Sequence, residues 1–302
     1  MQTGERLFQL QDLLDKEPSE KAWEALCKFL DTWSESEGLG EALDYAEQQL
    51  TGWSDNYRQT PWIWRKKILE RANPRLRIVR GLDLYARKIG DKGLATLAEM
   101  PPLANLTQLY LDSNDISNAG AAALAQSPYL TNLTILQLRY NNIGVEGMKA
   151  LAQSPNLSKL SQLRLDENQI GDAGALALAQ LPYLNNLTIL HLLGNGIGAE
   201  GAKALAQSSN LSKLTDLELI ENPIGDIGAS ALAQSPHLAN LVGLSLAFTQ
   251  IGDEAVVAVA QSPHLSKLVE LDLQGNNFSS VGRTALVDAG FKLDNQRWCR
   301  FD

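Results

Sequence analysis

Two aspartates occupy the same position in a pattern that recurs every 27 residues, and they could form a catalytic pair. Asp112 and Asp166 are 54 residues apart. If each unit contributes one strand, they lie two strands, or about 10 Å, from each other. Two carboxylates at such a separation can act as general acid and base in an inverting hydrolysis. No set of aromatic residues that would clamp a sugar accompanies them, so we do not expect an enzyme.

Other reactive residue types are few. Two of the three histidines, His237 and His264, occupy the same place in Ser-Pro-His-Leu, one unit apart, which indicates a role in the repeat. Cys27 and Cys299 lack metal-ligand spacing and cannot build a disulfide framework. The chain contains no Gly-x-x-x-x-Gly-Lys-Ser/Thr, Gly-x-Ser-x-Gly or His-Glu-x-x-His motif. We therefore expect no cofactor, no metal and no small-molecule substrate.

The pattern itself is a run of leucines at constant spacing, without insertion or deletion. They stand at positions 82, 109, 136, 163, 190, 217, 244 and 271. Each begins a Leu-x-Leu alternation, which is typical of a strand. A turn such as Ile170-Gly-Asp-x-Gly174 follows, with Asp172 well placed to cap a helix. An alanine-rich helix and, in most units, a proline then complete the unit.

One asparagine follows each strand in six of the eight units. Its short amide can donate to and accept from backbone groups in the turn, so we interpret this row as structural. The asparagines are at positions 114, 141, 168, 195, 222 and 276. Arg87 replaces it in the first unit, which predicts that this unit is open or covered by the leading segment. Thr249, in the seventh unit, can still donate one bond.

These repeats resemble the leucine-rich repeat family, in particular its ribonuclease-inhibitor-like type with a helix in every unit. The uniform 27-residue unit is similar to the arrays of bacterial members. The resemblance implies an α/β solenoid shaped as a curved horseshoe, with parallel strands on the concave face and helices on the convex face. It also implies a role in protein binding.

The ends of the chain differ from the repeat. Residues 1–75 show three stretches of helical spacing and a possible fourth helix from Thr60 and Pro61 through Ile68. Because an end repeat exposes an unpaired strand, these helices are interpreted as an N-terminal α-helical cap, with a separate recognition or signalling module as the alternative. Residues 76–302 form the repeat domain. Its C-terminal cap, from about residue 283, is expected to be a terminal helix and an aromatic lid that includes Phe301.

Exposed positions that vary from unit to unit are free to encode recognition. Residues between and just after the strand leucines are predicted to lie on the concave face. Aromatic residues and arginine are common in interface cores, and an apolar group rimmed by charges indicates a contact site. The candidate partner-binding residues are Tyr110, Arg139, Tyr140, Arg164, His191, Leu193, Ile220 and Phe248. Ordinary variation of a strand surface is the alternative.

A second candidate surface is the basic junction between the leading segment and the repeats. Residues 65–88 hold nine Lys or Arg residues against two acids. Its core set is Arg65, Lys66, Lys67, Arg71, Arg75, Arg77 and Arg80. It could dock an acidic partner, a phosphate-rich surface or nucleic acid, or it could be a solvated face that pairs with acids in residues 31–55.

Composition narrows the class of protein. A net charge of −9 argues against a general nucleic-acid binder, and no stretch is apolar enough to cross a membrane. Two cysteines and the absence of a signal-peptide pattern favour the cytoplasm. The predicted function is a non-enzymatic scaffold that binds a protein partner through its concave face. The alternative is a regulatory adaptor whose N-terminal helices recruit or signal while the repeats select the target.

Overall fold

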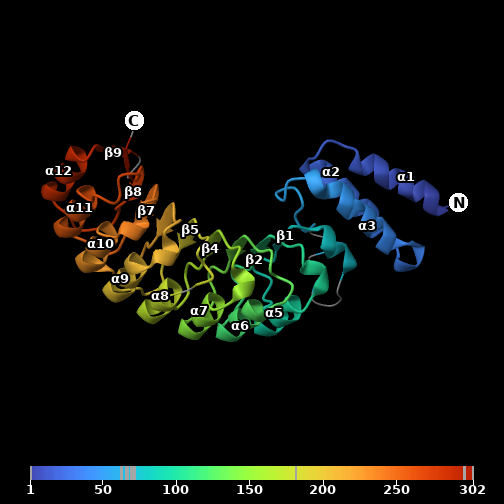
Figure 1. Ribbon diagram of the computed structural model, residues 1–302, viewed down its shortest axis with the longest axis horizontal. Coiled ribbons are helices and arrows are strands. Elements are labelled where there is room, and N and C mark those ends of the chain that lie inside the picture. Colours follow the sequence, from blue (N-terminus) through green and yellow to red (C-terminus); the bar gives the residue numbers. More distant parts are fainter. Residues whose placement is uncertain are drawn as a thin grey trace.

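The computed structural model describes residues 2–61, 64, 68, 73–180, 182–294 and 297–300. Strands line the inner side of an arc and helices its outer side, and three N-terminal helices form one arm (Figure 1). This is the predicted α/β solenoid. The predicted helix from Thr60 to Ile68 lies largely outside the described residues, although Trp64 and Ile68 are buried.

The eight repeat strands form one parallel sheet in chain order, each paired with the next at a shift of one unit, as in Leu82 with Leu109. The strand leucines point into the core and are almost fully buried. The strands are β1 (Gly81–Asp83), β2 (Gln108–Tyr110), β3 (Ile135–Gln137), β4 (Gln162–Arg164), β5 (Ile189–His191), β6 (Asp216–Glu218), β7 (Gly243–Ser245) and β8 (Glu270–Asp272).

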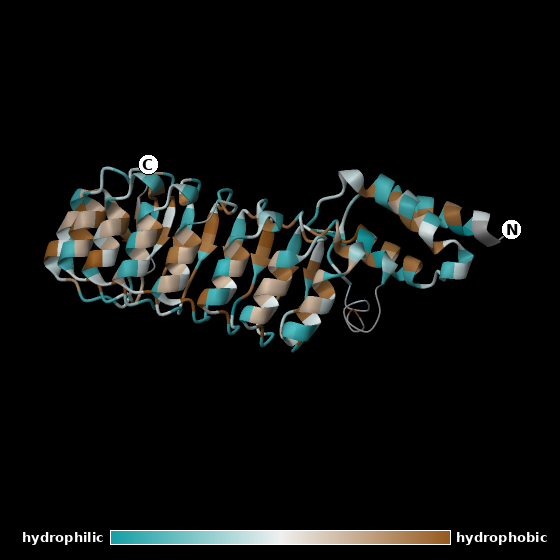
Figure 2. Cartoon of the chain, turned by 60° about the horizontal axis from the view of Figure 1, so that its bottom comes forward, coloured by the Kyte–Doolittle hydropathy of each residue, from teal (hydrophilic) through white to brown (hydrophobic). Residues whose placement is uncertain are grey.

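Each strand is followed by a helix of eight or nine residues, and neighbouring helices pack side by side (Figure 2). Alanine and leucine cover the inward face of each helix, so adjacent units approach closely. The helices are α5 (Gly90–Ala98), α6 (Asn118–Gln126), α7 (Val145–Ala152), α8 (Gly171–Ala179), α9 (Ala199–Gln207), α10 (Gly225–Ala233), α11 (Asp253–Ala260) and α12 (Ser280–Asp288). No described helix has the length and apolar run that crossing a bilayer requires.

The predicted asparagine row is a hydrogen-bonded ladder inside the stack. The Asn222 amide donates to the carbonyls of Leu192 and Leu219 at 2.8 and 3.1 Å, and its oxygen accepts from the N–H of Asn195 and Ile197 at 3.1 and 2.9 Å. The contacts to Leu192, Asn195 and Ile197 join this unit to the preceding one. The asparagines thus satisfy buried backbone groups that no regular element can pair.

Two units lack the ladder asparagine, and the residues that replace it make different contacts. Thr249 donates its hydroxyl to Leu246 O at 2.6 Å, which replaces one of the amide bonds. Arg87 is exposed, and its N–H donates to Asn114 Oδ1 of the next unit at 3.0 Å. The first unit is therefore open at this position. Its one ladder contact is the hydrogen bond to the Asn114 amide oxygen of the second unit.

The leading segment covers the first strand. Helices α1 (Gln2–Leu14), α2 (Glu20–Asp31) and α3 (Leu39–Gln49) pack together, and the chain then runs beside β1. Gln59 pairs in parallel with Gly81, and Thr60 N–H donates to Gly81 O at 2.7 Å. The edge of the sheet is thereby occupied by backbone from outside the repeats.

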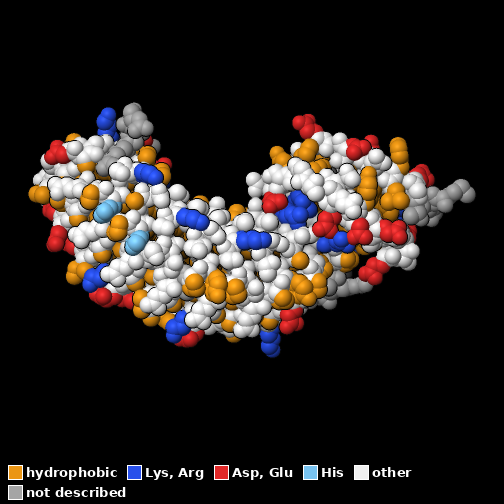
Figure 3. Space-filling model, in the orientation of Figure 1, with side chains coloured by type: hydrophobic (Ala, Val, Ile, Leu, Met, Phe, Trp, Pro, Cys, Tyr) orange, Lys and Arg blue, Asp and Glu red, His pale blue; other side chains and the backbone are white. Residues whose placement is uncertain are grey.

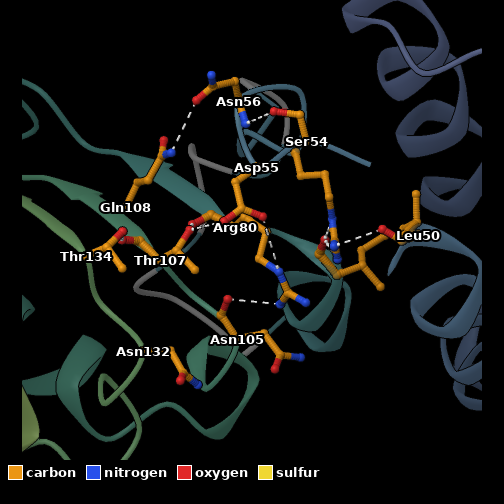
Figure 4. A network of polar contacts seen from close by, with 12 residues as sticks. Leu50, Ser54, Asp55, Asn56, Arg80, Asn105, Thr107, Gln108, Asn132 and Thr134 are labelled. Carbon is orange, nitrogen blue, oxygen red and sulfur yellow. Dashed lines mark hydrogen bonds and ion pairs between the residues drawn. The ribbon is translucent and has the colours of Figure 1, made fainter. Parts of the chain in front are cut away.

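Polar contacts reinforce this junction (Figure 4). Asp55 accepts from the Thr107 hydroxyl at 2.8 Å and lies 3.7 Å from Arg80 Nε, whose guanidinium also donates to Asn105 O at 2.9 Å. Deeper in the junction, Arg58 is only 2% exposed. Its guanidinium donates to Ile78 O at 2.6 and 3.0 Å and to Leu50 O at 3.3 Å, and burial lowers the pKa of Arg58 to about 10.

The opposite end of the sheet is closed by a hairpin. After α12 come β9 (Phe291–Asp294) and β10 (Arg297–Arg300), and β10 pairs antiparallel with β8. Phe291 and Trp298 are buried against the last unit. The predicted terminal helix and aromatic lid are present, but the lid is built on strands that the sequence analysis did not predict. Phe301 lies outside the described residues.

Candidate protein-binding face

Three columns of side chains run across the concave side of the arc, which is open as a hollow (Figure 3). The strand-end column consists of the last residue of each strand, and the loop and turn columns of the residues two and three positions further on. Ladder hydrogen bonds such as Tyr140 N–H to Asp166 O, at 2.8 Å, continue between units beyond the strands. These bonds hold the columns in register on a rigid sheet.

The turn column adopts the left-handed backbone conformation in all eight units. Tyr140 and Phe248 stand there at φ of 55° and 56°, and their side chains are 57% and 51% exposed. The Phe248 ring lies over Gly275, where an added Cβ would come within 2.2 Å of the ring. This glycine makes room for the ring on the surface.

Arg139 is paired within the face. Its guanidinium donates from Nε and a terminal nitrogen to Asp112 Oδ2, at 3.0 and 2.8 Å, and its N–H donates to Asp112 Oδ1 at 2.8 Å. Asp112 is buried, so this charge-assisted pair neutralises one of the two aspartates of the suspected catalytic pair. The arrangement is that of a structural ion pair.

Tyr110 is half-buried near the N-terminal end of the face. Its hydroxyl donates to Gln108 Oε1 at 2.9 Å, and the same oxygen accepts from Gln59 Nε2 at 2.8 Å. Burial raises the pKa of Tyr110. This residue therefore links the face to the leading segment.

Arg164, His191 and the acids around them form a polar cluster at the centre. His191 Nδ1 lies 3.2 Å from Glu218 Oε2, and Nε2 lies 3.3 Å from Asp216 Oδ1. The Nε2 atom is buried and too poorly aligned for a hydrogen bond, and Arg164 Nε is likewise buried without a partner. Burial raises the pKa of Glu218. Burial also raises the pKa of Asp166, although His191 and the nearby arginines oppose it.

Asp216 and Glu218 belong to this cluster, although neither was among the candidates from the sequence. Asp216 is the first residue of β6, and the first and last residues of a three-residue strand face the same side. The alternation of Leu-x-Leu therefore contained the signal. The same alternation places the first residue of each strand, such as Ile135 and Ile189, on the concave side, where these residues form a fourth column.

Leu193 and Ile220 lie in consecutive units, and each is half-buried. Gly194 N–H donates to Ile220 O at 2.9 Å, which sets the two residues side by side. These two candidate residues are therefore only partly open to solvent. Tyr140 and Phe248 are the exposed members of the set.

The described residues of the core set of the basic junction, Arg75, Arg77 and Arg80, make contacts within the molecule, whereas Arg87 and Lys88 are exposed. Arg75 donates to Leu30 O at 3.0 Å, Arg77 lies 2.5 Å from Asp44 and 2.9 Å from Glu47, and Arg80 pairs with Asp55. The acids belong to residues 31–55, as the alternative interpretation proposed. Arg65, Lys66, Lys67 and Arg71 lie outside the described residues.

Comparison with known proteins gives one family. A leucine-rich repeat model matches residues 103–125, 129–152, 156–179, 183–206, 210–233 and 264–287. The two unmatched units are those in which Arg87 and Thr249 replace the ladder asparagine. No curated protein matches the chain.

Among similar solved structures is an internalin from Listeria monocytogenes, with 24% identity and a TM-score of 0.42. The match covers 69% of this chain and 65% of that structure. The chain therefore spans less than two thirds of the length of this relative.

Proposed function

Because the chain belongs to the leucine-rich repeat family, we propose that it is a non-enzymatic scaffold that binds a protein partner through the concave face. Members of this family typically mediate protein–protein interactions. The single observation that supports the concave face most is the exposure of Tyr140 and Phe248 on a sheet whose backbone is held from both sides. Large aromatic side chains on a rigid support lose little conformational entropy on binding.

The proposed contact set is the one expected from the sequence. Tyr140 and Phe248 serve as the exposed anchors, and Leu193 and Ile220 form the half-buried apolar floor between them. Charged residues of the strand-end column, such as Arg164 and Glu218, lie beside this floor. Such an apolar centre with a polar rim is the general anatomy of a protein interface.

Affinity capture from the native cell extract tests this function. The Tyr140→Ala/Phe248→Ala double variant should lose prey that the unaltered chain retains, because truncation of anchors typically costs 2 kcal/mol or more, or about 30-fold in affinity. Ile227→Ala is the matched control, since Ile227 is 62% exposed on helix α10 of the convex side. Equal capture by the double variant would refute the concave face, whereas equal loss in both variants would indicate a general defect.

We also infer that residues 1–75 act as the cap of the array. The pairing of Gln59 with Gly81 and the buried Arg58 support this, because removal of the segment would expose the β1 edge. Deletion of residues 1–75 should then cause aggregation. Soluble repeats that still bind the partner would instead support the adaptor, in which the N-terminal helices are a separate module.

A further inference from the structure

We propose that Asp166, His191 and Glu218 form a binding site for a divalent transition-metal ion on the concave face. The three side chains come from consecutive units: Asp166 follows β4, and His191 and Glu218 end β5 and β6. One ligand atom from each lies within 4.8 Å of the others. This site goes beyond the proposed function, because it needs no protein partner.

The distances suit an ion after small side-chain rotations. An ion about 2.1 Å from each of its ligands sets neighbouring ligand atoms roughly 3.4 Å apart. His191 Nδ1 and Glu218 Oε2 are already at 3.2 Å. Because Asp166 and Glu218 lie on neighbouring columns of the same face, the side chains converge without a change in the backbone.

The surroundings of His191 provide a second, independent argument. With Nδ1 beside Glu218, the other ring nitrogen faces Asp216 Oδ1 at 3.3 Å and has no hydrogen-bond partner. Histidines that bind metals usually donate their second N–H to a carboxylate, which fixes the ring. Asp216 is therefore the positioning residue, because its carboxylate lies close enough to accept the N–H of the second ring nitrogen.

Comparison between units shows why Asp166 is available. Asp112 has the same position two units earlier, and Arg139 neutralises it. At Asp166 the equivalent neighbour is Leu193, which donates only its N–H, at 3.1 Å to Oδ1. Among the described residues no cation forms an ion pair with Asp166. The second oxygen of this buried carboxylate is therefore available to bind a metal ion.

The charge and the ligand types indicate the class of ion. Asp166, Asp216 and Glu218 carry three negative charges when ionised, and Arg164 supplies one positive charge nearby, which leaves −2. One imidazole with two carboxylates favours Zn²⁺, Co²⁺ or Mn²⁺ over Mg²⁺ and Ca²⁺, which prefer all-oxygen sites. Three protein ligands would leave coordination positions open to water.

Titration of the full chain with Co²⁺, followed by its visible absorption and by displacement with Zn²⁺, tests the site. We expect one saturable ion per chain that Mg²⁺ does not displace. His191→Ala should abolish the absorption change, while Asp166→Asn, Glu218→Gln and Asp216→Asn should each weaken binding by roughly tenfold or more. Arg164→Gln should tighten binding, because it removes the neighbouring positive charge.

The chain offers its own matched controls. His237→Ala and His264→Ala remove the other two histidines, which lie outside the cluster, and should bind Co²⁺ as the unaltered chain does. Circular dichroism checks that each variant is folded. Absence of saturable binding, or unchanged binding in His191→Ala, would overturn the proposal. The Tyr140→Ala/Phe248→Ala variant should keep the ion, so failure of the metal site and failure of the partner face are distinguished.

Discussion

Asp172 of helix α8 accepts a hydrogen bond of 2.7 Å from the N–H of Gly198, which opens the helix of the next unit. The same oxygen accepts from Gly201 N–H at 2.9 Å. The aspartate expected to cap a helix therefore caps its neighbour's helix. Asn118 does the same for Gly144 and Gly147. This second ladder runs along the outer side of the arc and couples consecutive units.

Replacement of Asp172 measures the strength of this ladder. Asp172→Ala should lower the free energy of unfolding by about 1 kcal/mol, because two N–H groups at a helix start lose their acceptor. Asp172→Asn should cost less, since Asn118 performs the same role with an amide oxygen. Thermal unfolding of both variants provides the comparison, and equal losses would contradict the capping role.

Breaking the asparagine ladder should lower the free energy of unfolding by more than the loss of the Asp172 cap does. Asn222→Ala leaves several buried backbone groups without partners, at about 1–3 kcal/mol for each group that water cannot reach. Urea unfolding should show a loss of about 2–4 kcal/mol. The exposed Asn240, changed to Ala, is the control and should cost far less. Thr249→Asn should raise stability, because it restores an amide to a position where the hydroxyl donates only once.

Arg58 is expected to hold the cap in place. Arg58→Met should destabilise the chain by about 2–4 kcal/mol, because the carbonyls of Ile78 and Leu50 lose their buried donors. Arg87→Met is the control, since Arg87 is exposed and such substitutions usually change stability by less than about 0.5 kcal/mol. Chemical unfolding curves that coincide for the two variants would argue against this role.

Gly275 tests how Phe248 is presented. Gly275→Ala should displace the Phe248 ring and weaken partner binding nearly as much as Phe248→Ala. Gly196→Ala is a close control, because both glycines have φ of 67° and nothing lies within 4 Å of a Cβ at Gly196. Both substitutions then carry the same backbone strain, about 1 kcal/mol. They differ only in that the Cβ added at position 275 meets the Phe248 ring. If partner binding fell equally in both variants, the position of the Phe248 ring would not matter for recognition of the partner.

Asp253 should make part of the stability dependent on pH. The Ser279 hydroxyl, together with the N–H groups of Ser279 and Gly282, lowers the pKa of Asp253. Because the folded pKa is below the unfolded one, the ionised carboxylate stabilises the fold above the unfolded pKa, and this contribution is lost as the pH falls through the folded pKa. Asp253→Asn should therefore unfold at a lower temperature than the unaltered chain at pH 7.

That difference in unfolding temperature should shrink as the pH is lowered from about 4, the ordinary range of an aspartate. Glu254→Gln removes a charge from the exposed neighbouring position and is the control. A difference that stays constant with pH would show that Asp253 acts through something other than its charge.

Local residue types determined the repeat, the strand and helix of each unit and the role of the asparagines. Each of these depends on positions within one unit or on the same position in adjacent units, and a constant period makes such relations visible in a linear sequence. The resemblance to leucine-rich repeats rested on the same regularity, and the fold and the family are confirmed.

Only the tertiary structure decided which side chains meet across units. Asp172 caps the neighbouring helix, Arg139 neutralises Asp112, and His191 lies between Glu218 and Asp216. These contacts depend on the stagger and curvature of stacked units, which set side chains from adjacent strands within a few ångströms of each other. Residue spacing along the chain fixes which unit a side chain belongs to, but the partner of a charge depends on how far the units turn relative to one another.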